Sequence, residues 1–447
     1  MRCASIATGL AAALALAAGL PAAPARAQPP PAVVVTPGSA ETFRAAVQRF
    51  ADGSAVPDPQ RAEAFRQALG SALEFSNVFR VLDPKAFLGP EATGSLDDEF
   101  DVVCSDWGQI GADALIQGEL SVSASRFSVE FRIWDTAGCR RLLRKRYRQA
   151  ADADPKVIAR RIADDVVEEF TGVRGVSSTE IAFVSDRSGN TEIYVMDADG
   201  GNQRPATANR SINNFPSWDA AGDAIAYTSY RDAGYPALFV SLRGRGRPGR
   251  LLPNLNSGVP QYRAVFDRQG DRVAVVLSAD GAAEIYTARP NGKQIKRLTR
   301  HGAIDVSPTW SPDGSRLAFV SDRSGSPQVY IVQADGSGLR RLTYEGSYNT
   351  TPTWSPDGRW IAYETRLEGQ FDIWLIDPEG RVNVPLVAHP RNDESPTWAP
   401  NSRKLAFSSN RRGKRDIYVI DSDGENVRRI TRKAGNNKSP AWAPFPR

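Results

Sequence analysis

The feature that most constrains this chain is a tryptophan that returns every 44 residues near its end. Most copies stand in phrases such as Pro308-Thr-Trp-Ser-Pro-Asp-Gly, and they fall at Trp310, Trp354, Trp398 and Trp442. Two weaker copies precede them, around Trp218 and Phe266. A repeat of about 40 to 50 residues that contains several short strands is typical of a β-propeller, in which each repeat forms one blade.

Each repeat is expected to contain four antiparallel strands joined by tight turns. In the repeat that begins at Pro308, these strands span residues 308–311, 317–321, 328–332 and 339–343. Asp-Gly and Ser-Gly pairs lie between them, and glycine adopts the positive φ that such turns require. The segment 317–321, Leu-Ala-Phe-Val-Ser, is expected to be a half-buried strand.

The first and last repeats are incomplete, and together they make one blade. The first, from Ile181, lacks the tryptophan-bearing inner strand, whereas the last, Pro440–Pro444, contains only that strand. We therefore expect the C-terminal strand to complete the first blade. Such a ring of six blades leaves no sheet edge exposed at its closure. The tryptophans are interpreted as core residues between adjacent blades.

Residues 28–175 are expected to form an α/β domain in front of the propeller. Amphipathic helices are predicted over 60–74 and from Pro155 to Gly172, with a shorter helix near 100–110. Strands are predicted over 45–50, 78–82, 114–122, 127–134 and 141–148. The predicted fold class is an α/β N-terminal domain followed by an all-β six-bladed propeller over 176–447.

The first 27 residues have the pattern of an export signal. Arg2 precedes an apolar run over 6–20, and Ala25-Arg26-Ala27 is a small-x-small cleavage motif. We predict cleavage after Ala27 and a soluble, exported product; an uncleaved anchor is the alternative. Export would leave Cys104 and Cys139 as the only cysteines of the mature chain. In an oxidising compartment they are a candidate disulfide, and two separate buried thiols are the alternative.

Residue types that carry catalysis are scarce in this sequence. It contains no serine elbow, no paired-histidine zinc motif and no phosphate loop. His301 and His389 occupy equivalent connections between blades, and the Asp-Gly pairs follow the blades as turns do. The formal net charge is +5, with no basic stripe that aromatics interrupt, which argues against nucleic-acid binding. We therefore expect no enzyme activity, no cofactor and no metal.

The connections that lead into the six inner strands should surround one opening of the central channel, called here the mouth. They are polar and differ from blade to blade, as expected of a docking surface, although turn solvation would explain any one of them. The predicted partner-binding residues are Asn214, Phe215, Pro260, Tyr262, Arg263, Val306, Ser307, Thr350, Thr351, Asp393, Glu394 and Lys438. The arginines expected on the same face are Arg187, Arg231, Arg323, Arg366, Arg411 and Arg412.

The repeat phrases, the Ser-Asp-Arg-Ser-Gly connections and the closing Pro440-Ala-Trp-Ala-Pro resemble the TolB family. So do the segments 111–118 and 170–175, and the order of signal, α/β domain and propeller. The resemblance implies a periplasmic, non-catalytic component of the Tol–Pal system that supports outer-membrane integrity and cell division. Its implied partners are the lipoprotein Pal, bound at the mouth, and TolA, engaged by the mature N-terminal segment.

Pro260, Val306 and Glu394 lie in the connections that match the family's Pal-contacting loops. The chain departs from the family at Pro260, where some relatives have histidine, and at its mature start, Gln28-Pro-Pro-Pro31. Two other classes remain open. A scaffold of another envelope complex would share every feature except the partner. A prolyl-oligopeptidase-like propeller would need a hydrolase domain with a serine elbow, which the sequence does not contain.

Overall fold

The computed structural model describes residues 42–88, 102–232, 234–243, 245–255, 258–367, 369–432 and 435–446. The predicted export signal and its cleavage site lie outside these ranges. The described residues belong to one compact unit. Among their helices, none combines the length and the apolar character that a membrane crossing requires.

The α/β domain is one mixed sheet with two long helices. Its strands are β1 (Phe43–Val47), β2 (Ala51–Asp52), β3 (Phe79–Val81), β4 (Ala114–Val122), β5 (Arg126–Asp135) and β6 (Arg140–Ala150). Its helices are α1 (Pro59–Phe75), the short 3-10 turn η1 (Pro84–Ala86), α2 (Cys104–Gln109) and α3 (Pro155–Thr171). The strand order is β3-β1-β4-β5-β6, with β2 beside β4. β1 runs parallel to β3 and β4, and β4, β5 and β6 are antiparallel.

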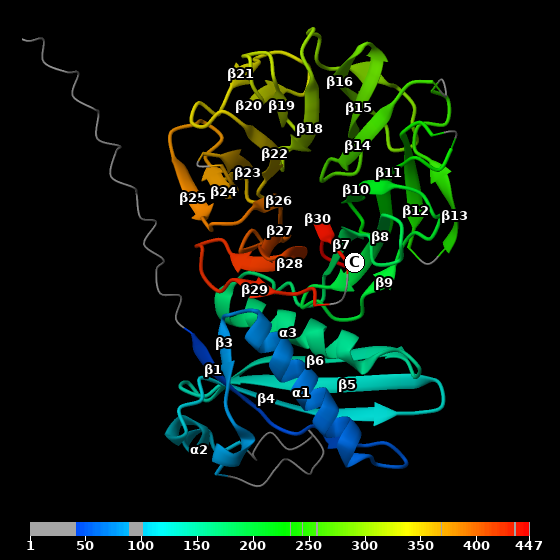
Figure 1. Cartoon of the computed structure of the whole chain (residues 1–447). Coiled ribbons are helices and arrows are strands. Elements are labelled where there is room, and N and C mark those ends of the chain that lie inside the picture. Colours follow the sequence, from blue (N-terminus) through cyan, green and yellow to red (C-terminus); the bar gives the residue numbers. More distant parts are fainter. Residues whose placement is uncertain are drawn as a thin grey trace, which may run out of the picture. The chain divides into compact units, whose positions relative to one another are not determined.

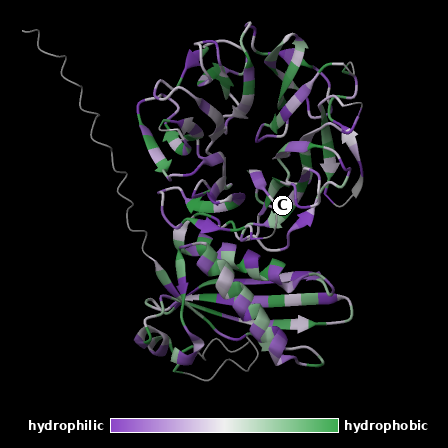
Figure 2. Cartoon of the chain, viewed as in Figure 1, coloured by the Kyte–Doolittle hydropathy of each residue, from purple (hydrophilic) through white to green (hydrophobic). Residues whose placement is uncertain are grey.

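The two long helices begin and end where local chemistry dictates. Asp58 accepts hydrogen bonds from the first free N–H groups of α1, and Asp154 caps α3 in the same way. Gly172 ends α3 with φ +67°, a conformation that favours glycine. Hydrophobic and hydrophilic residues alternate along both helices in Figure 2. Their apolar sides join the sheet in one core, which includes Phe65, Leu69 and Ile162.

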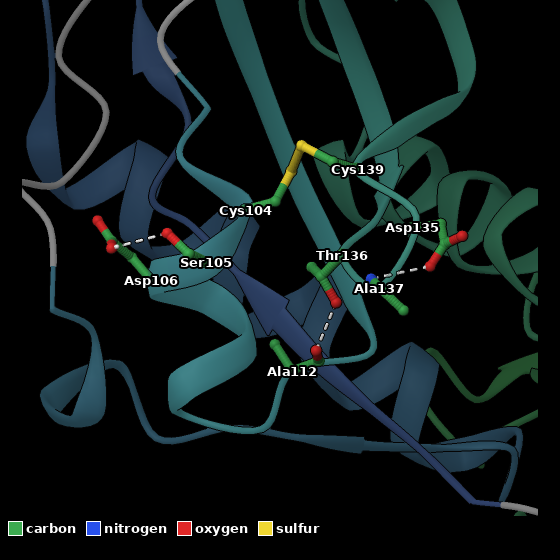
Figure 3. The surroundings of a disulfide bond; sticks show 8 residues. All are labelled: Cys104, Ser105, Asp106, Ala112, Asp135, Thr136, Ala137 and Cys139. Carbon is green, nitrogen blue, oxygen red and sulfur yellow. Dashed lines mark hydrogen bonds between the residues drawn. A yellow bond between two sulfur atoms is a disulfide. The ribbon is translucent and has the colours of Figure 1, made fainter.

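A disulfide joins Cys104 of α2 to Cys139 in the β5–β6 turn, with the two Cα atoms 5.6 Å apart (Figure 3). The turn is held by further contacts drawn in the same view. The Thr136 hydroxyl donates to the Ala112 carbonyl, and the Ala137 N–H donates to Asp135. The bridge therefore ties a six-residue helix to the hairpin beside it.

The propeller consists of six four-stranded antiparallel sheets, which Figure 1 shows arranged as a ring. Blade 1 contains β30 (Asn437–Trp442), β7 (Glu180–Ser185), β8 (Glu192–Asp197) and β9 (Arg204–Pro205). Blade 2 contains β10 (Asn213–Trp218), β11 (Ala224–Ser229), β12 (Ala237–Leu242) and β13 (Arg245–Arg250). Blade 3 contains β14 (Gln261–Phe266), β15 (Val273–Asp280), β16 (Ala282–Ala288) and β17 (Lys296–Arg297).

The remaining three blades repeat the same plan. Blade 4 contains β18 (Asp305–Trp310), β19 (Arg316–Ser321), β20 (Gln328–Gln333) and β21 (Arg340–Arg341). Blade 5 contains β22 (Asn349–Trp354), β23 (Ile361–Arg366), β24 (Phe371–Ile376) and β25 (Asn383–Val387). Blade 6 contains β26 (Asp393–Trp398), β27 (Lys404–Arg412), β28 (Lys414–Asp421) and β29 (Arg428–Arg429). The prediction of a six-bladed propeller is therefore confirmed.

The ring closes through the last strand. β30 pairs antiparallel with β7, so that Trp442 lies opposite Ile181. The Trp442 indole N–H also donates to the Thr179 hydroxyl at 2.8 Å. Segments more than 250 residues apart in the sequence thus share one sheet, and β7 is not left with an unpaired inner edge.

The repeated tryptophans are core residues, as the sequence indicated. The five tryptophans of the inner strands are only 5–7% exposed. Three of the indole N–H groups bridge neighbouring blades: Trp218 donates to the Ala441 carbonyl, Trp310 to the Val265 carbonyl and Trp398 to the Thr353 carbonyl. A buried indole usually needs such a partner. The packing leaves these donors without a role in ligand binding.

Strand bounds differ from the expectation at both edges of a blade. The inner strand of blade 4 begins at Asp305 and not at Pro308, because its pairing with β19 continues beyond a β-bulge after Val306. The outer strand of the same blade is only two residues long. The alternation of residues in the sequence does not reveal a bulge. The polar strand at the outer edge of a blade forms only a few hydrogen bonds with its neighbour.

Candidate functional site

The mouth predicted from the sequence is formed by two sets of connections. Asn213, the first residue of β10, pairs with Ser229, the last residue of β11. The connection into the inner strand therefore opens on the same face as the connection between the second and third strands. Asp305 and Ser321 are paired in the same way in blade 4. The strands β10, β14, β18, β22, β26 and β30 are the ones nearest the centre of the ring in Figure 1.

The first residue of each inner strand is buried and structural. Asp393 is fully buried, and it accepts a hydrogen bond from the Arg411 guanidinium at 2.9 Å. Arg411 in turn lies over the ring of Tyr418, 4.7 Å from its centroid. Burial raises the pKa of Asp393, and Arg411 opposes that effect. Asp393 thus supports the mouth from within; its role as a partner contact stays a prediction.

The same clamp recurs in other blades. Arg323 pairs with buried Asp305 at 2.7 Å, and Arg187 donates to Asn437 at 2.7 Å. Both guanidinium groups lie over blade aromatics. Three of the six arginines expected on this face are therefore turned inward, where they join the second and third strands to the inner strand. Their repetition reflects blade packing.

The third residue of every inner strand has a left-handed backbone conformation, with a positive φ. We call these six residues the αL ring: Phe215, Arg263, Ser307, Thr351, Ser395 and Ser439, with φ between +39° and +56°. The strand pairing shifts register at this level in all six blades. Such a bulge bends the strand and redirects a side chain. A positive φ is uncommon for a residue other than glycine, most of all for a β-branched one such as Thr351.

Charged groups meet in the channel beside this ring. The Arg263 guanidinium donates to the Ser307 hydroxyl at 2.9 Å and lies 5.7 Å from the centre of the Phe215 ring. Glu364 of β23 accepts hydrogen bonds from the Thr350 hydroxyl and the Ser395 N–H. Burial raises the pKa of Glu364 and lowers that of Arg263.

The charge of Glu394 is balanced by an arginine from another strand of the same blade. Arg415 of β28 contacts both of its carboxylate oxygens, at 2.7 Å and 3.1 Å. Among the second residues of the inner strands, Asn214, Tyr262, Val306, Thr350 and Glu394 are half-buried and Lys438 is exposed. Pro260 is half-buried in the connection before β14. All predicted mouth residues therefore lie at one end of the channel. Some are at or before the first two residues of the inner strands, and the others belong to the αL ring, deeper in the channel.

The sequence reasoning missed an apolar component of the mouth. Five exposed hydrophobic side chains of its connections and Phe215 of β10 are called here the rim: Ile212, Phe215, Tyr235, Ile304, Tyr348 and Leu367. Tyr344, further back in the connection that leads to β22, is exposed as well. Ile212, Ile304 and Tyr348 each stand directly before an inner strand. In blades 6 and 1 the corresponding residues are Asn392 and Asn436. An apolar residue inside a polar turn was the signal that the sequence offered. Of the six rim residues, only Phe215 was among the predicted partner-binding residues.

The two histidines make local turn contacts. The Nδ1 atoms of His301 and His389 accept the N–H groups of Ala303 and Arg391. In the part of the chain that the structure describes, no group of three or more His, Cys, Asp or Glu side chains is arranged to hold a metal ion.

Comparison with known proteins identifies both domains. Family models for the TolB beta propeller domain and the TolB amino-terminal domain match residues 167–446 and 31–142. The Tol-Pal system protein TolB of Anaeromyxobacter dehalogenans (strain 2CP-C) is 36% identical over 302 residues, 67% of each chain. The protein of the same name from Desulfosudis oleivorans is 36% identical over 256 residues, so the chain spans about half (54%) of that relative's length.

A solved structure resembles nearly the whole chain. The crystal structure of TolB from Acinetobacter baumannii has a TM-score of 0.75 and 23% sequence identity, and the match covers 90% of this chain and 97% of that one. At this identity the likeness establishes the fold, whereas the propeller family model, which matches more than half of the chain, establishes the family. With an amino-terminal domain and a propeller that match the two family models in the same order, this chain belongs to the TolB family.

Proposed function

We propose that this protein is a non-catalytic periplasmic adaptor of the Tol–Pal system that binds the peptidoglycan-associated lipoprotein Pal at the propeller mouth. In this role it helps to maintain outer-membrane integrity and envelope constriction during division. Membership of the TolB family supports the system, because two relatives are named as Tol-Pal system proteins. The mouth residues support the place of binding.

The observation that carries the proposal is the rim. Ile304 is 51% exposed, Tyr235 55% and Tyr348 40%, all in connections that open on one face. Exposed apolar side chains that gather over a polar, concave opening are typical of a protein interface, and aromatic residues often contribute most of the binding free energy. Turn solvation explains polar residues at these positions, but it does not explain isoleucine and tyrosine.

The polar half of the mouth would orient the partner. Lys438 is exposed and the Glu394–Arg415 pair is half-buried, and both lie on blades 6 and 1, away from the rim. Rim-type hydrophobic contacts supply affinity, while exposed charges mainly affect the association rate and the choice of partner. A partner that buries the rim and places an acidic group near Lys438 would match both halves.

The decisive experiment measures binding of the soluble Pal domain from the same organism to the mature protein by calorimetry. Ile304→Ala and Tyr348→Ala should each weaken binding about tenfold or more, because they truncate central apolar contacts. Leu339→Ala is the matched control. Leu339 is a 43% exposed hydrophobic residue that precedes β21, on the face opposite the mouth.

Equal losses in the rim and control variants would overturn the mouth as the binding site. Failure of the wild-type protein to bind Pal, together with recovery of a different envelope protein from detergent-solubilised membranes, would favour a scaffold of another complex. The proposed contact with TolA is separate. It concerns the mature N-terminal segment, outside the described residues, and deletion of residues 28–41 should abolish TolA binding while leaving Pal binding intact.

A further inference from the structure

A cavity of about 310 Å³, called here the chamber, lies in the central channel on the side opposite the mouth. Its walls come from the second half of all six inner strands, and the turns after those strands reach its outer end. Arg263 of the αL ring also lines it. The chamber therefore extends from the ring toward the face that carries Asp219 and Arg268.

Proline rings make up much of the chamber wall. Nine prolines line it: Pro216, Pro308, Pro312, Pro352, Pro356, Pro396, Pro400, Pro440 and Pro444. A proline has no N–H donor and a fixed φ, so the proline rings form apolar, preorganised parts of a wall that also contains serine, threonine and aspartate side chains. Inner strands are also sheet edges, and proline at an edge prevents unwanted pairing. Edge protection explains the prolines, but it does not require a charged side chain among them.

Blade 3 departs from the repeat at four positions, of which Arg263, Phe266 and Arg268 line the chamber. Where other blades have a proline before the tryptophan, β14 has Ala264, and where they have tryptophan it has Phe266. Arg268 stands where four other blades have the second proline. Arg263 replaces a serine, threonine or phenylalanine of the αL ring. One blade thus contributes a cation at each end of an otherwise proline-lined space.

Both arginines are held in place by contacts across the channel. Arg263 donates to Ser307 of blade 4 and lies against the Phe215 ring of blade 2. Arg268 reaches past blade 4 and donates to the Pro356 carbonyl of blade 5 at 2.9 Å. Among the described residues neither guanidinium is within ion-pair distance of a carboxylate. The charge of Glu364 acts on Arg263 from beyond that distance, and the Glu364 carboxylate is already held by Thr350 and Ser395. Both guanidinium groups therefore keep N–H donors for a ligand.

The acidic residues of the chamber are already engaged by their own turns. Asp267 accepts the N–H groups of Asp271 and Arg272 and pairs with the Arg272 guanidinium at 2.9 Å. Asp219 accepts two backbone N–H groups of the turn that follows it. The groups left to meet a ligand therefore include the two guanidinium ions, the Ser217 hydroxyl and the proline rings.

From this arrangement we infer that the chamber is a second binding site, for a small organic carboxylate with a flat apolar body. The carboxylate meets the Arg263 guanidinium at the inner end, since arginine presents paired donors that match a carboxylate. The apolar body lies among the proline rings, and Arg268 crosses over the outer end. The volume is in the range of small-molecule sites. The chamber shares Arg263 with the mouth, but its ligand is a different molecule from the partner bound there.

The test uses the mature full-length protein and a matched pair of probes, 2-naphthoate and 2-naphthamide, which share a body and differ in charge. Calorimetry should show that the carboxylate binds at least about tenfold more tightly than the amide, the ratio expected when one charge-assisted hydrogen-bonded contact is lost. Arg263→Gln should remove this preference, and Arg263→Lys should keep part of it.

A chamber-filling variant locates the site. Ser217 lines the chamber and its hydroxyl makes no hydrogen bond among the described residues, so Ser217→Phe should occupy the space and abolish binding of both probes. Leu339→Ala should bind both as the wild type does, and unchanged melting curves would show that each variant is folded. Equal affinity for both probes, tighter binding of the cationic 2-naphthylmethylamine, full binding by Ser217→Phe or no binding by the wild type would each overturn the inference.

Discussion

The two ends of the central channel are built from the same six strands, yet they differ in how their residues vary. At the mouth the six connections differ in sequence, and blades 2 to 5 contribute apolar residues where blades 6 and 1 contribute asparagine. At the chamber four blades follow nearly the same phrase, blade 2 lacks the second proline, and blade 3 departs at four positions. Variation around a ring suits an asymmetric partner. Where most blades repeat the same phrase, the blade that differs most from it is the one expected to have a separate role.

The largest effect should come from removing the strand that serves both ends. Truncation after Thr431 deletes β30, which brings Lys438 to the mouth and Pro440 to the chamber. We expect blade 1 to lose its inner edge and the propeller to unfold at a much lower temperature. The loss should exceed the roughly 3–5 kcal/mol of a single buried aromatic.

Circular dichroism and hydrogen exchange of the β7 amides would measure this loss. Truncation after Phe445 is the control, because it keeps β30 and the contact of Phe445 with Arg174. If the shorter protein melted at the wild-type temperature, closure by β30 would not be what holds the ring together.

A pair of variants within β10 separates packing from binding. Trp218 is 7% exposed and Phe215 is 38% exposed, three residues apart in the same strand. Trp218→Ala should lower the free energy of unfolding by about 3–5 kcal/mol. Phe215→Ala should lower it by less than about 1 kcal/mol but weaken Pal binding. Urea denaturation and calorimetry would test both halves, and a reversed order of stabilities would contradict the interpretation of the tryptophans as core.

Glu364 gives the mouth end a pH dependence. Its folded-state pKa is raised above the ordinary value of 4.5, mainly by burial. The stability this group contributes is therefore full below about pH 4.5 and is lost as the pH rises through the folded pKa. Each pH unit between the two pKa values corresponds to about 1.4 kcal/mol.

Glu364→Gln removes the titration while its amide can still contact Thr350 and Ser395. Urea denaturation from pH 4 to pH 8 should then show a smaller decline than in the wild type, so that the difference between the two proteins is greatest near pH 8. Parallel profiles would mean that the carboxyl titrates at its ordinary pKa in the folded protein.

The smallest effect is expected at the exposed charge of the mouth. Lys438→Ala should reduce Pal affinity only about two- to threefold, mostly through a slower association rate, because exposed charges are screened by salt. Surface plasmon resonance at low and high ionic strength would show the difference disappear in salt. A loss as large as that of Tyr348→Ala would place the main binding contact on the polar half of the mouth.

Much of the fold could be predicted because it rests on local chemistry. The spacing of the tryptophans indicated the blades, and Pro155 and Gly172 marked the bounds of α3. The bulges of the inner strands were not predictable, since neither Ser307 nor Thr351 is a residue that favours positive φ. These bulges decide which side chains face the channel, so the αL ring and the role of Arg263 emerged only in three dimensions.

The candidate site shows the same division. Its location followed from the order of strands within a repeat, and all twelve predicted residues lie around one end of the channel. The roles within it depended on packing: Asp393 and Arg411 looked like surface polar residues, yet they form a buried clamp. The apolar rim was overlooked because an isolated isoleucine in a turn carries no periodic pattern.

By itself, the sequence determined the number of blades, the closure by the strand around Trp442 and the family. Each copy of the repeat has nearly the same pattern of strands and turns, so each copy folds into the same four-stranded blade. Only the tertiary structure decided what the channel contains. Side chains from different blades meet there at distances that no spacing along the chain encodes, as when Arg268 reaches Pro356. Ring closure brings those blades together, and with them the charges and proline rings that distinguish one end of the channel from the other.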